Sequence, residues 1–239
     1  ESEAAKEYRH GLEVNRSSGQ LYFKLAGLSQ KQHRISEAEG LYRQWMEVQP
    51  NDAQAHVALA QFYQSTGRLK EAETSYQRAR QVDPSSHLAQ ESLIMFYLET
   101  NRLKEAGLEI DTFLKQNPMD LAGRILQARL TLEQGDTEKA VSLLQDVARQ
   151  APKLAIAHQY LGIALARRHD IPQAISALKE AQTLAPDSSD IHANLAQVYL
   201  AQGSLSLAIR EGETAIELNP QKVTALRALA DAHLLAGDA

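Results

Sequence analysis

Apolar and small residues recur along this chain in a pattern that repeats every 34 positions. When repeats are counted from residues 19, 53, 87, 121, 155, 189 and 223, the seventh position reads Leu25, Leu59, Leu93, Gln127, Leu161, Leu195 and Leu229. The eighth position is nearly always small and reads Ala26, Ala60, Ile94, Ala128, Gly162, Ala196 and Ala230. Positions 4, 7, 8 and 11 lie on one face of a helix with 3.6 residues per turn. Each repeat is therefore predicted to begin with an amphipathic helix.

A second helix is predicted in the latter half of each repeat. Position 20 is alanine in every copy, at Ala4, Ala38, Ala72, Ala106, Ala140, Ala174 and Ala208. Positions 20, 24 and 27 share a helical face, and a small residue there lets two helices approach closely. Position 32 is proline in six copies, at Pro50, Pro84, Pro118, Pro152, Pro186 and Pro220. Because proline cannot continue a helix, it should end the second one.

A tight turn is predicted between the two helices of each repeat. Position 15 reads His33, Gly67, Asn101, Gly135, His169, Gly203 and Gly237. Glycine, and after it asparagine and histidine, best tolerates the positive φ that such a turn requires. After the proline, Asp52, Ser86, Asp120 and Ser188 are suited to cap the next first helix. Pro172 is expected in the first turn of a second helix, where proline costs little.

A fixed period of this length is typical of a solenoid, so the fold class is predicted to be all-α. The pattern resembles the tetratricopeptide repeat, most closely in the second copy with Leu59, Ala60, Tyr63, Gly67, Ala72, Tyr76, Ala79 and Pro84. The resemblance implies a right-handed α-solenoid of about fourteen helices in a single array, 1–239. That array would contain a leading second helix in 1–18, full repeats at 19–52, 53–86, 87–120, 121–154, 155–188 and 189–222, and a trailing first helix in 223–239.

Some residues depart from the repeat pattern. Large side chains occupy small-residue positions at Trp45, Ile94 and Phe113, while Gln127 and Thr131 replace the usual leucine and tyrosine. Irregular packing or altered curvature around the third and fourth repeats is one interpretation. Ordinary repeat drift with compensating neighbours is the other.

Composition limits the function classes. The net charge of −5 and a pI near 5.9 argue against nucleic-acid binding, which needs a clustered basic surface. No window of 18 apolar residues occurs, so no membrane insertion is expected. The absence of cysteine excludes disulfides and thiolate chemistry, which leaves bacterial cytoplasm and periplasm open, with a slight preference for the periplasm. The first residue is not methionine and the last lies within a repeat, so we expect a fragment of a longer protein.

Catalytic and metal-binding chemistry is not indicated, and no cofactor is expected. Of the eight histidines, His56, His158 and His192 share position 4. The same position in successive repeats recurs about 10 Å apart, too far to share a zinc ion with bonds of about 2 Å. Metalloprotease, phosphate-loop and nucleophile-elbow motifs are absent. Ser176 and Lys179 are best interpreted as part of a solvated helix. The chain is therefore predicted not to be an enzyme.

The resemblance implies a partner-binding concave groove lined by the first helices at positions 2, 5, 6, 9, 12 and 13. The first three repeats place Gln20, Phe23, Lys24, Gln30, Lys31, Gln54, Val57, Gln61, Gln64, Leu88 and Glu99 there. The lysine and asparagine clamp of chaperone-binding members is missing, since its positions hold Phe23 and Gly27, Val57 and Gln61, or Glu91 and Met95. An apolar strip of Met95, Leu98, Ile125, Leu132 and Ile163, edged by Glu91, Arg129 and Arg167, suits an amphipathic helix or an extended peptide.

The sequence thus favours a non-enzymatic scaffold that binds a protein or peptide. The predicted contact residues are Glu91, Met95, Leu98, Ile125, Arg129, Leu132, Gln159, Ile163, Arg167, Asn194 and Gln197. Alternatively, several of these pack against neighbouring helices and are never exposed. The alternative function is a self-associating structural segment of a larger bacterial secretion or exopolysaccharide-export protein. A third possibility is an array that regulates a catalytic domain outside this chain.

Overall fold

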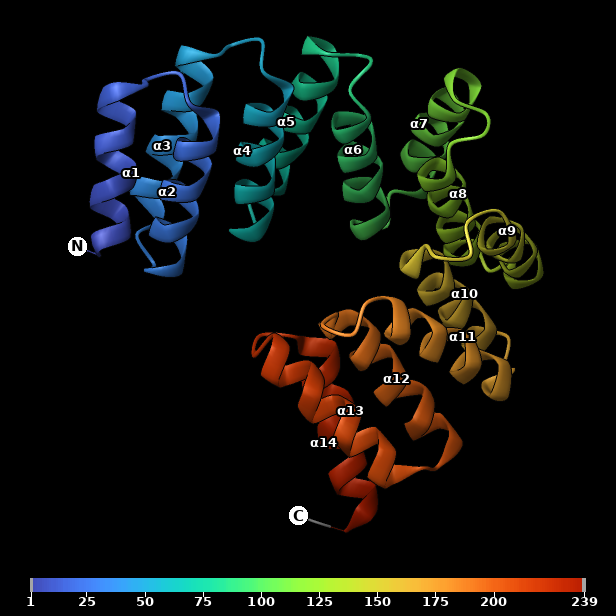
Figure 1. The fold of residues 1–239 in the computed structure, drawn as a ribbon. Helices are drawn as coiled ribbons and strands as arrows, with labels where there is room; N and C mark the ends of the chain where they lie inside the picture. The colour runs from blue at the N-terminus through green and yellow to red at the C-terminus, as the bar shows by residue number, and fades with distance from the viewer. Residues whose placement is uncertain (1, 238–239) are drawn as a thin grey trace. The chain divides into compact units, whose positions relative to one another are not determined.

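A computed structural model describes residues 2–237, and in that range the chain forms fourteen α-helices and no strand (Figure 1). The second helices of the repeats are α1 (Glu3–Val14), α3 (Ile35–Val48), α5 (Leu69–Val82), α7 (Leu103–Gln116), α9 (Thr137–Gln150), α11 (Ile171–Leu184) and α13 (Leu205–Leu218). The first helices are α2 (Gly19–Lys31), α4 (Ala53–Ser65), α6 (His87–Glu99), α8 (Leu121–Glu133), α10 (Ala155–Arg167), α12 (Ser189–Gln202) and α14 (Val223–Ala236). The predicted all-α fold of helix pairs is confirmed. Glu1, expected in the leading helix, and 238–239 of the trailing segment lie outside the described residues.

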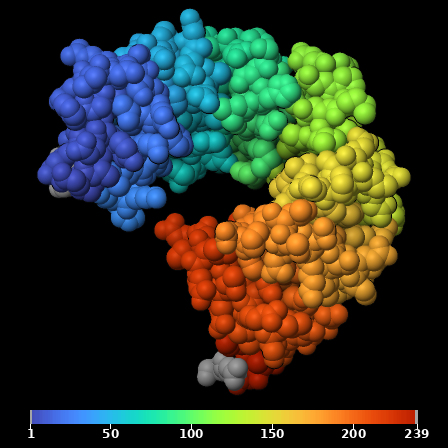
Figure 2. All heavy atoms as spheres, viewed as in Figure 1, coloured from blue at the N-terminus to red at the C-terminus, as the bar shows by residue number. Residues whose placement is uncertain are grey.

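The chain forms two compact units, Glu1–Glu109 and Ile110–Ala239, which we call the N-terminal unit and the C-terminal unit. In the N-terminal unit, α4 packs against α3, α5 and α6. In the C-terminal unit, α10 packs against α9 and α11 and also contacts the first helices α8 and α12. Both α4 and α10 thus contact the second helix of their own repeat, the second helix of the preceding repeat and at least one first helix of an adjacent repeat. The space-filling view shows the helices of the N-terminal unit, coloured blue to green, packed from one repeat to the next (Figure 2).

The turn predicted between the two helices is present in each of the six repeats for which the structure describes both helices. Position 15 has a positive φ in all seven copies: His33, Gly67, Asn101, Gly135, His169, Gly203 and Gly237. Three of these residues are not glycine, and their φ angles of 57° to 64° lie in the small left-handed region that asparagine and histidine tolerate best. The composition of this one position therefore follows from the backbone geometry that it must adopt.

Small residues line the seam between the helices of each repeat. Ala26, Ala60, Ala128 and Ala196 are buried at position 8, as are the alanines of position 20 from Ala38 onward. Gly162 takes the same place in α10. A Cβ atom at Gly162 would lie 2.5 Å from Leu178 Cγ and 3.1 Å from the backbone oxygen of Ala174, inside normal contact distance. The backbones approach too closely there for a larger residue.

Two of the large residues that break the pattern are matched by glycines. A Cβ atom at Gly19 would lie 2.5 Å from the indole ring of Trp45, and one at Gly123 would lie 2.7 Å from the ring of Phe113. In both cases a bulky second-helix side chain fills the space that a first-helix side chain would otherwise occupy. At these two places the pattern drifts with a compensating neighbour, which was one of the two interpretations from the sequence.

Position 4 makes a hydrogen bond across the boundary between repeats. The Nε2 atoms of His56, His158 and His192 lie 3.2, 2.9 and 2.8 Å from the carbonyl oxygens of the preceding Pro50, Pro152 and Pro186. Gln90 donates its side-chain amide to the Pro84 carbonyl in the same way. A carbonyl oxygen only accepts, so the Nε2 atom of each of these histidines carries a proton. These side chains hold the loop that joins a second helix to the next first helix.

Candidate protein-binding groove

The first helices of the N-terminal unit line two adjoining hollows. One, of about 330 Å³, is lined by Gln20, Phe23, Trp45, Gln54, Val57, Ala58, Gln61 and Leu88. The other, of about 500 Å³, is lined by Gln61, Gln64, Ser65, Tyr76, Leu88, Glu91, Ser92, Met95, Phe96 and Glu99. Gln61 and Leu88 belong to both, so the two hollows form one continuous surface across α2, α4 and α6. We call this surface the N-terminal groove.

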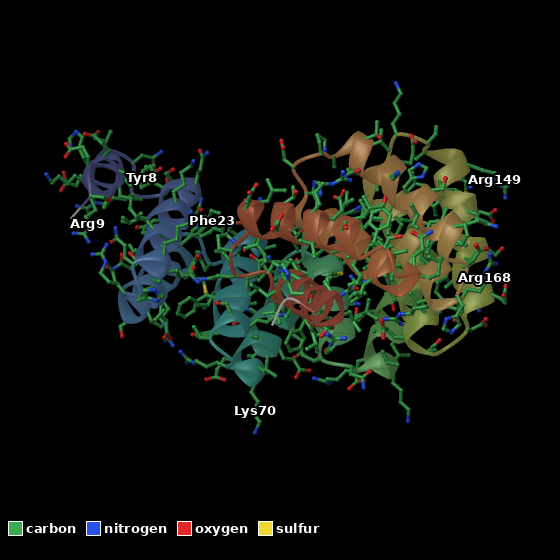
Figure 3. The ribbon with its side chains drawn as sticks, turned by 90° about the horizontal axis from the view of Figure 1, so that it is seen from below. Tyr8, Arg9, Phe23, Lys70, Arg149 and Arg168 are labelled. Carbon is green, nitrogen blue, oxygen red and sulfur yellow. The ribbon has the colours of Figure 1, made fainter. Side chains whose placement is uncertain are left out.

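The end of the N-terminal groove near the beginnings of the helices is apolar. Phe23 and Leu88 are 49% and 43% exposed, whereas Val57, which lines the same hollow, is buried. Figure 3 labels Phe23 on α2, and the lining of the first hollow places it beside α4. Trp45 lines the same hollow, and its indole N–H donates to Gln49 Oε1 at 2.8 Å and Asp52 Oδ2 at 3.1 Å. These bonds hold the ring, so the apolar end is shaped before any partner arrives.

The other end of the N-terminal groove is polar and is ordered by a chain of hydrogen bonds. The Tyr76 hydroxyl donates to Gln64 Oε1 at 2.8 Å, and the Gln64 amide donates to Glu99 Oε2 at 2.7 Å. Burial raises the pKa of Tyr76 to about 12, and the negative charge of Glu99 adds to the effect. Tyr76 therefore remains a hydrogen-bond donor at neutral pH and fixes the orientation of the Gln64 amide.

Successive repeats of the N-terminal unit are joined by a polar cluster. Glu39 on α3 accepts from the Tyr63 hydroxyl at 3.1 Å, from Arg68 at 2.7 Å and from Arg43 at 2.8 Å. The guanidinium of Arg68 also stacks on the Tyr63 ring, 4.3 Å from its centroid. Burial alone would raise the pKa of Glu39, but the hydrogen bonds from Arg43, Arg68 and Tyr63 outweigh it and lower that pKa.

The same cluster recurs one repeat later. Glu73 accepts from Tyr97 at 3.2 Å and pairs with Arg102 at 2.6 Å, while Arg102 lies over the Tyr97 ring at 4.7 Å. Hydrogen bonds from Arg102 lower the pKa of Glu105, as those from Arg68 lower that of Glu71. Two consecutive repeat junctions, from α3 to α4 and from α5 to α6, are thus tied by charge-assisted bonds.

The structure divides the contact residues predicted from the sequence. Glu91 and Met95 line the N-terminal groove. Leu98, Ile125 and Leu132 are buried, so the prediction that they form part of an exposed apolar strip is wrong. The alternative, in which they pack against neighbouring helices, holds for these three.

The remaining predicted residues lie on first helices of the C-terminal unit. The Arg129 guanidinium lies 5.0 Å from the Tyr160 ring centroid. Arg167 donates to Glu133 Oε1 at 2.8 Å and to the Leu132 carbonyl at 3.3 Å. Gln159 is buried, Ile163 and Asn194 are half-buried, and Gln197 is exposed. These residues are not among those that line the N-terminal groove.

Several lining residues lie outside the set chosen from the sequence. The resemblance placed Phe23, Val57, Gln61 and Leu88 at groove positions of the repeat, but they were not among the predicted contact residues. The aromatic side chain of Phe23, at position 5 of an alanine-rich pattern, was the signal that could have identified this part of the groove. Trp45 and Tyr76 come from second helices, and repeat position alone does not reveal that they reach the groove. In residues 2–237, no helix is long and apolar enough to cross a membrane, and no three potential metal-ligating side chains cluster.

Comparisons with known proteins agree on one fold. Family models described as tetratricopeptide repeat match residues 29–92 and, in overlapping segments, 92–239. A tetratricopeptide repeat protein from Parabacteroides merdae is 14% identical with a TM-score of 0.78, covering 95% of this chain and 90% of that chain. A thermophilic protein of the same repeat type from Thermus thermophilus is 25% identical with a TM-score of 0.67, covering 76% of this chain and 99% of that chain. The Pseudomonas aeruginosa protein pilF is 16% identical with a TM-score of 0.57, covering 96% and 100%. No curated protein sequence matches this chain.

Proposed function

Because this chain belongs to the tetratricopeptide repeat family, we propose that it is a non-enzymatic scaffold whose N-terminal groove binds a segment of a partner protein. The family fold supports a protein-interaction scaffold in general, and the lining of the N-terminal groove supports the choice of that surface as the binding site. The observation that carries the proposal is that the exposed side chains of Phe23 and Leu88 line one hollow together with the buried Val57.

The composition of the groove is that of an interaction site. Burying a side chain of the size of leucine or phenylalanine contributes about 1.5 to 3 kcal/mol, so one partner residue seated beside Phe23 and Leu88 would supply a useful share of the affinity. Glutamine side chains at Gln20, Gln54 and Gln61 surround the apolar end and can both donate and accept hydrogen bonds. An apolar centre with a polar rim is the usual anatomy of a protein interface.

The test is selection from a displayed library of random peptides on the immobilised whole chain. We expect selected peptides to lose binding to the Leu88→Glu variant. Leu69→Glu is the matched control, because Leu69 is 46% exposed on α5 and does not line the groove. Circular dichroism should show equal helix content in both variants. Equal binding of the selected peptides to both variants would rule out the N-terminal groove as the site.

A second candidate function is self-association, and exposed apolar residues on α14 favour it. Val223, Leu234 and Leu235 are largely exposed, and Leu226 is also exposed. Light scattering of the wild type and of Leu234→Glu tests this candidate. A mass above that of the monomer in the wild type, reduced in the variant, would support association through α14, whereas a monomeric wild type excludes it.

A further inference from the structure

We propose that the N-terminal groove recognises an extended segment that carries an apolar side chain and a lysine or arginine about five residues apart. This inference rests on the proposed function, because it names the partner of the same groove. It follows from three features of the groove: an apolar end, an acidic end and a polar stretch between them.

The apolar end lies at the beginnings of the first helices. Leu88 is the second residue of α6, and Phe23 and Val57 lie in the early turns of α2 and α4. All three line the same hollow, so a single apolar side chain of the partner would contact all of them. This end therefore selects a residue of the size of leucine, methionine or phenylalanine.

The acidic end lies where α6 finishes. Glu99 is the last residue of α6 and is exposed, and its hydrogen-bond donor is the neutral amide of Gln64. In the part of the chain that the structure describes, no ion pair joins Glu99 to a cation. A carboxylate at a helix C-terminus is also unfavourable, because that end already carries partial negative charge. A positively charged partner residue would be attracted both by the Glu99 carboxylate and by the partial negative charge at the end of α6.

The same chain shows what such a carboxylate accepts. Glu133 occupies position 13 of its repeat, as Glu99 does, and ends α8 as Glu99 ends α6. Glu133 is paired with the guanidinium of Arg167 at 2.8 Å. Within this protein, a glutamate at position 13 thus forms an ion pair with an arginine. At Glu99 we assign the corresponding cation to the partner.

The spacing between the two ends sets the length and form of the segment. Glu99 follows Leu88 by eleven residues of one helix, a rise of about 16 Å. An extended chain advances about 3.3 Å per residue and covers this span in about five residues. A helical partner would need about eleven.

The side chains between the two ends favour the extended form. Gln61, Glu91, Ser92 and Met95 line this stretch, and the polar ones among them carry both donors and acceptors. The backbone N–H and C=O groups of an extended segment have no internal partners and require such groups when they are covered. In a helical partner these backbone groups are already paired within the helix, so they would not bond to these side chains.

The experiment uses labelled peptides with one leucine and one arginine, separated along the chain by offsets of three to twelve residues with serine and threonine between. Binding to the whole chain is followed by fluorescence anisotropy, with both orders of the two residues. We expect the tightest binding at offsets of about four to six. Glu99→Gln should weaken that peptide about fivefold, the size of an exposed ion pair. Glu47→Gln removes the same charge from exposed Glu47 on α3 and should leave binding unchanged.

Reversing both charges provides a further check, since Glu99→Arg should restore binding to a peptide in which the arginine is replaced by glutamate. An optimum near eleven residues, or an affinity that is independent of offset and of Glu99, overturns this inference. If such peptides still lose binding in Leu88→Glu, the proposed function survives that result. Binding that ignores Leu88 as well as Glu99 overturns both.

Discussion

The Nδ1 atom of His192 lies 2.7 Å from Glu211 Oε2, and both side chains are buried between α12 and α13. The other ring nitrogen of His192 faces the Pro186 carbonyl at 2.8 Å. Both nitrogens therefore face acceptors, and a neutral imidazole has only one N–H. The contact requires a second proton, held either on the imidazole or on the carboxyl group. Gln182 and Arg210 also donate to Glu211, at 3.0 and 3.1 Å, and the Gln182 amide nitrogen lies 3.3 Å from His192 Nδ1 as well.

His192→Gln should destabilise the protein by about 3 kcal/mol. The substitution keeps a donor for the Pro186 carbonyl, as Gln90 shows for Pro84, but it removes the hydrogen-bond partner of the buried Glu211 carboxyl group, and a buried polar group left unpaired is costly. His56→Gln is the matched control, because His56 makes the same bond to Pro50. Burial lowers the pKa of His56, which therefore stays neutral at pH 7. Urea denaturation followed by circular dichroism measures both variants, and equal costs would contradict a stabilising role for the contact between His192 and Glu211.

Two glycine-to-alanine substitutions should have opposite signs. Gly27 in α2 has no atom within 4 Å of an added Cβ, so Gly27→Ala should stabilise by about 0.5 to 1 kcal/mol through helix propensity. Gly162→Ala would press on Leu178 Cγ and the Ala174 carbonyl and should destabilise by about 1 to 3 kcal/mol. Thermal melts of the two variants provide the comparison. A stabilising Gly162→Ala would mean that α10 and α11 can move apart at little cost.

The Tyr76 hydroxyl should titrate near pH 12. Because its folded pKa lies above the ordinary value of 10.0, folding favours the protonated phenol. The resulting stability is complete below pH 10 and is lost as the pH rises toward 12. Ultraviolet absorbance during an alkaline titration should show a late-ionising tyrosine that is missing in Tyr76→Phe. An unchanged titration curve in the variant would refute this assignment.

Glu39 should contribute to stability on the acid side. Its folded pKa is below the ordinary 4.5, so its contribution is present above that value and is lost as the pH falls through the folded pKa. Glu39→Gln should therefore be less stable than the wild type at pH 7, and the difference should shrink in acid. Denaturation at a series of pH values tests this. A difference that stays constant with pH would show that the charge of Glu39 is not involved.

Most of the fold was predictable because backbone geometry restricts particular positions to particular residues. The left-handed turn restricts position 15 to glycine, asparagine or histidine, and close helix contact restricts positions 8 and 20 to small residues. Exposure of the candidate site was less predictable. Repeat position indicates which face of a first helix Leu98 or Ile125 occupies. It does not indicate whether side chains of other helices bury that face. Trp45 and Tyr76 reach the groove from second helices through contacts that no period reveals.

The bond from position 4 to the preceding proline carbonyl has a consequence for building chimaeras from these repeats. Its donor and acceptor belong to consecutive 34-residue copies, as with His158 and Pro152 or His192 and Pro186. Cutting the gene between copies therefore separates the two halves of one contact. In shuffled or consensus arrays, the junction should therefore lie inside a helix. A junction placed between copies needs histidine or glutamine at position 4 of the downstream repeat, so that the bond to the proline carbonyl can form.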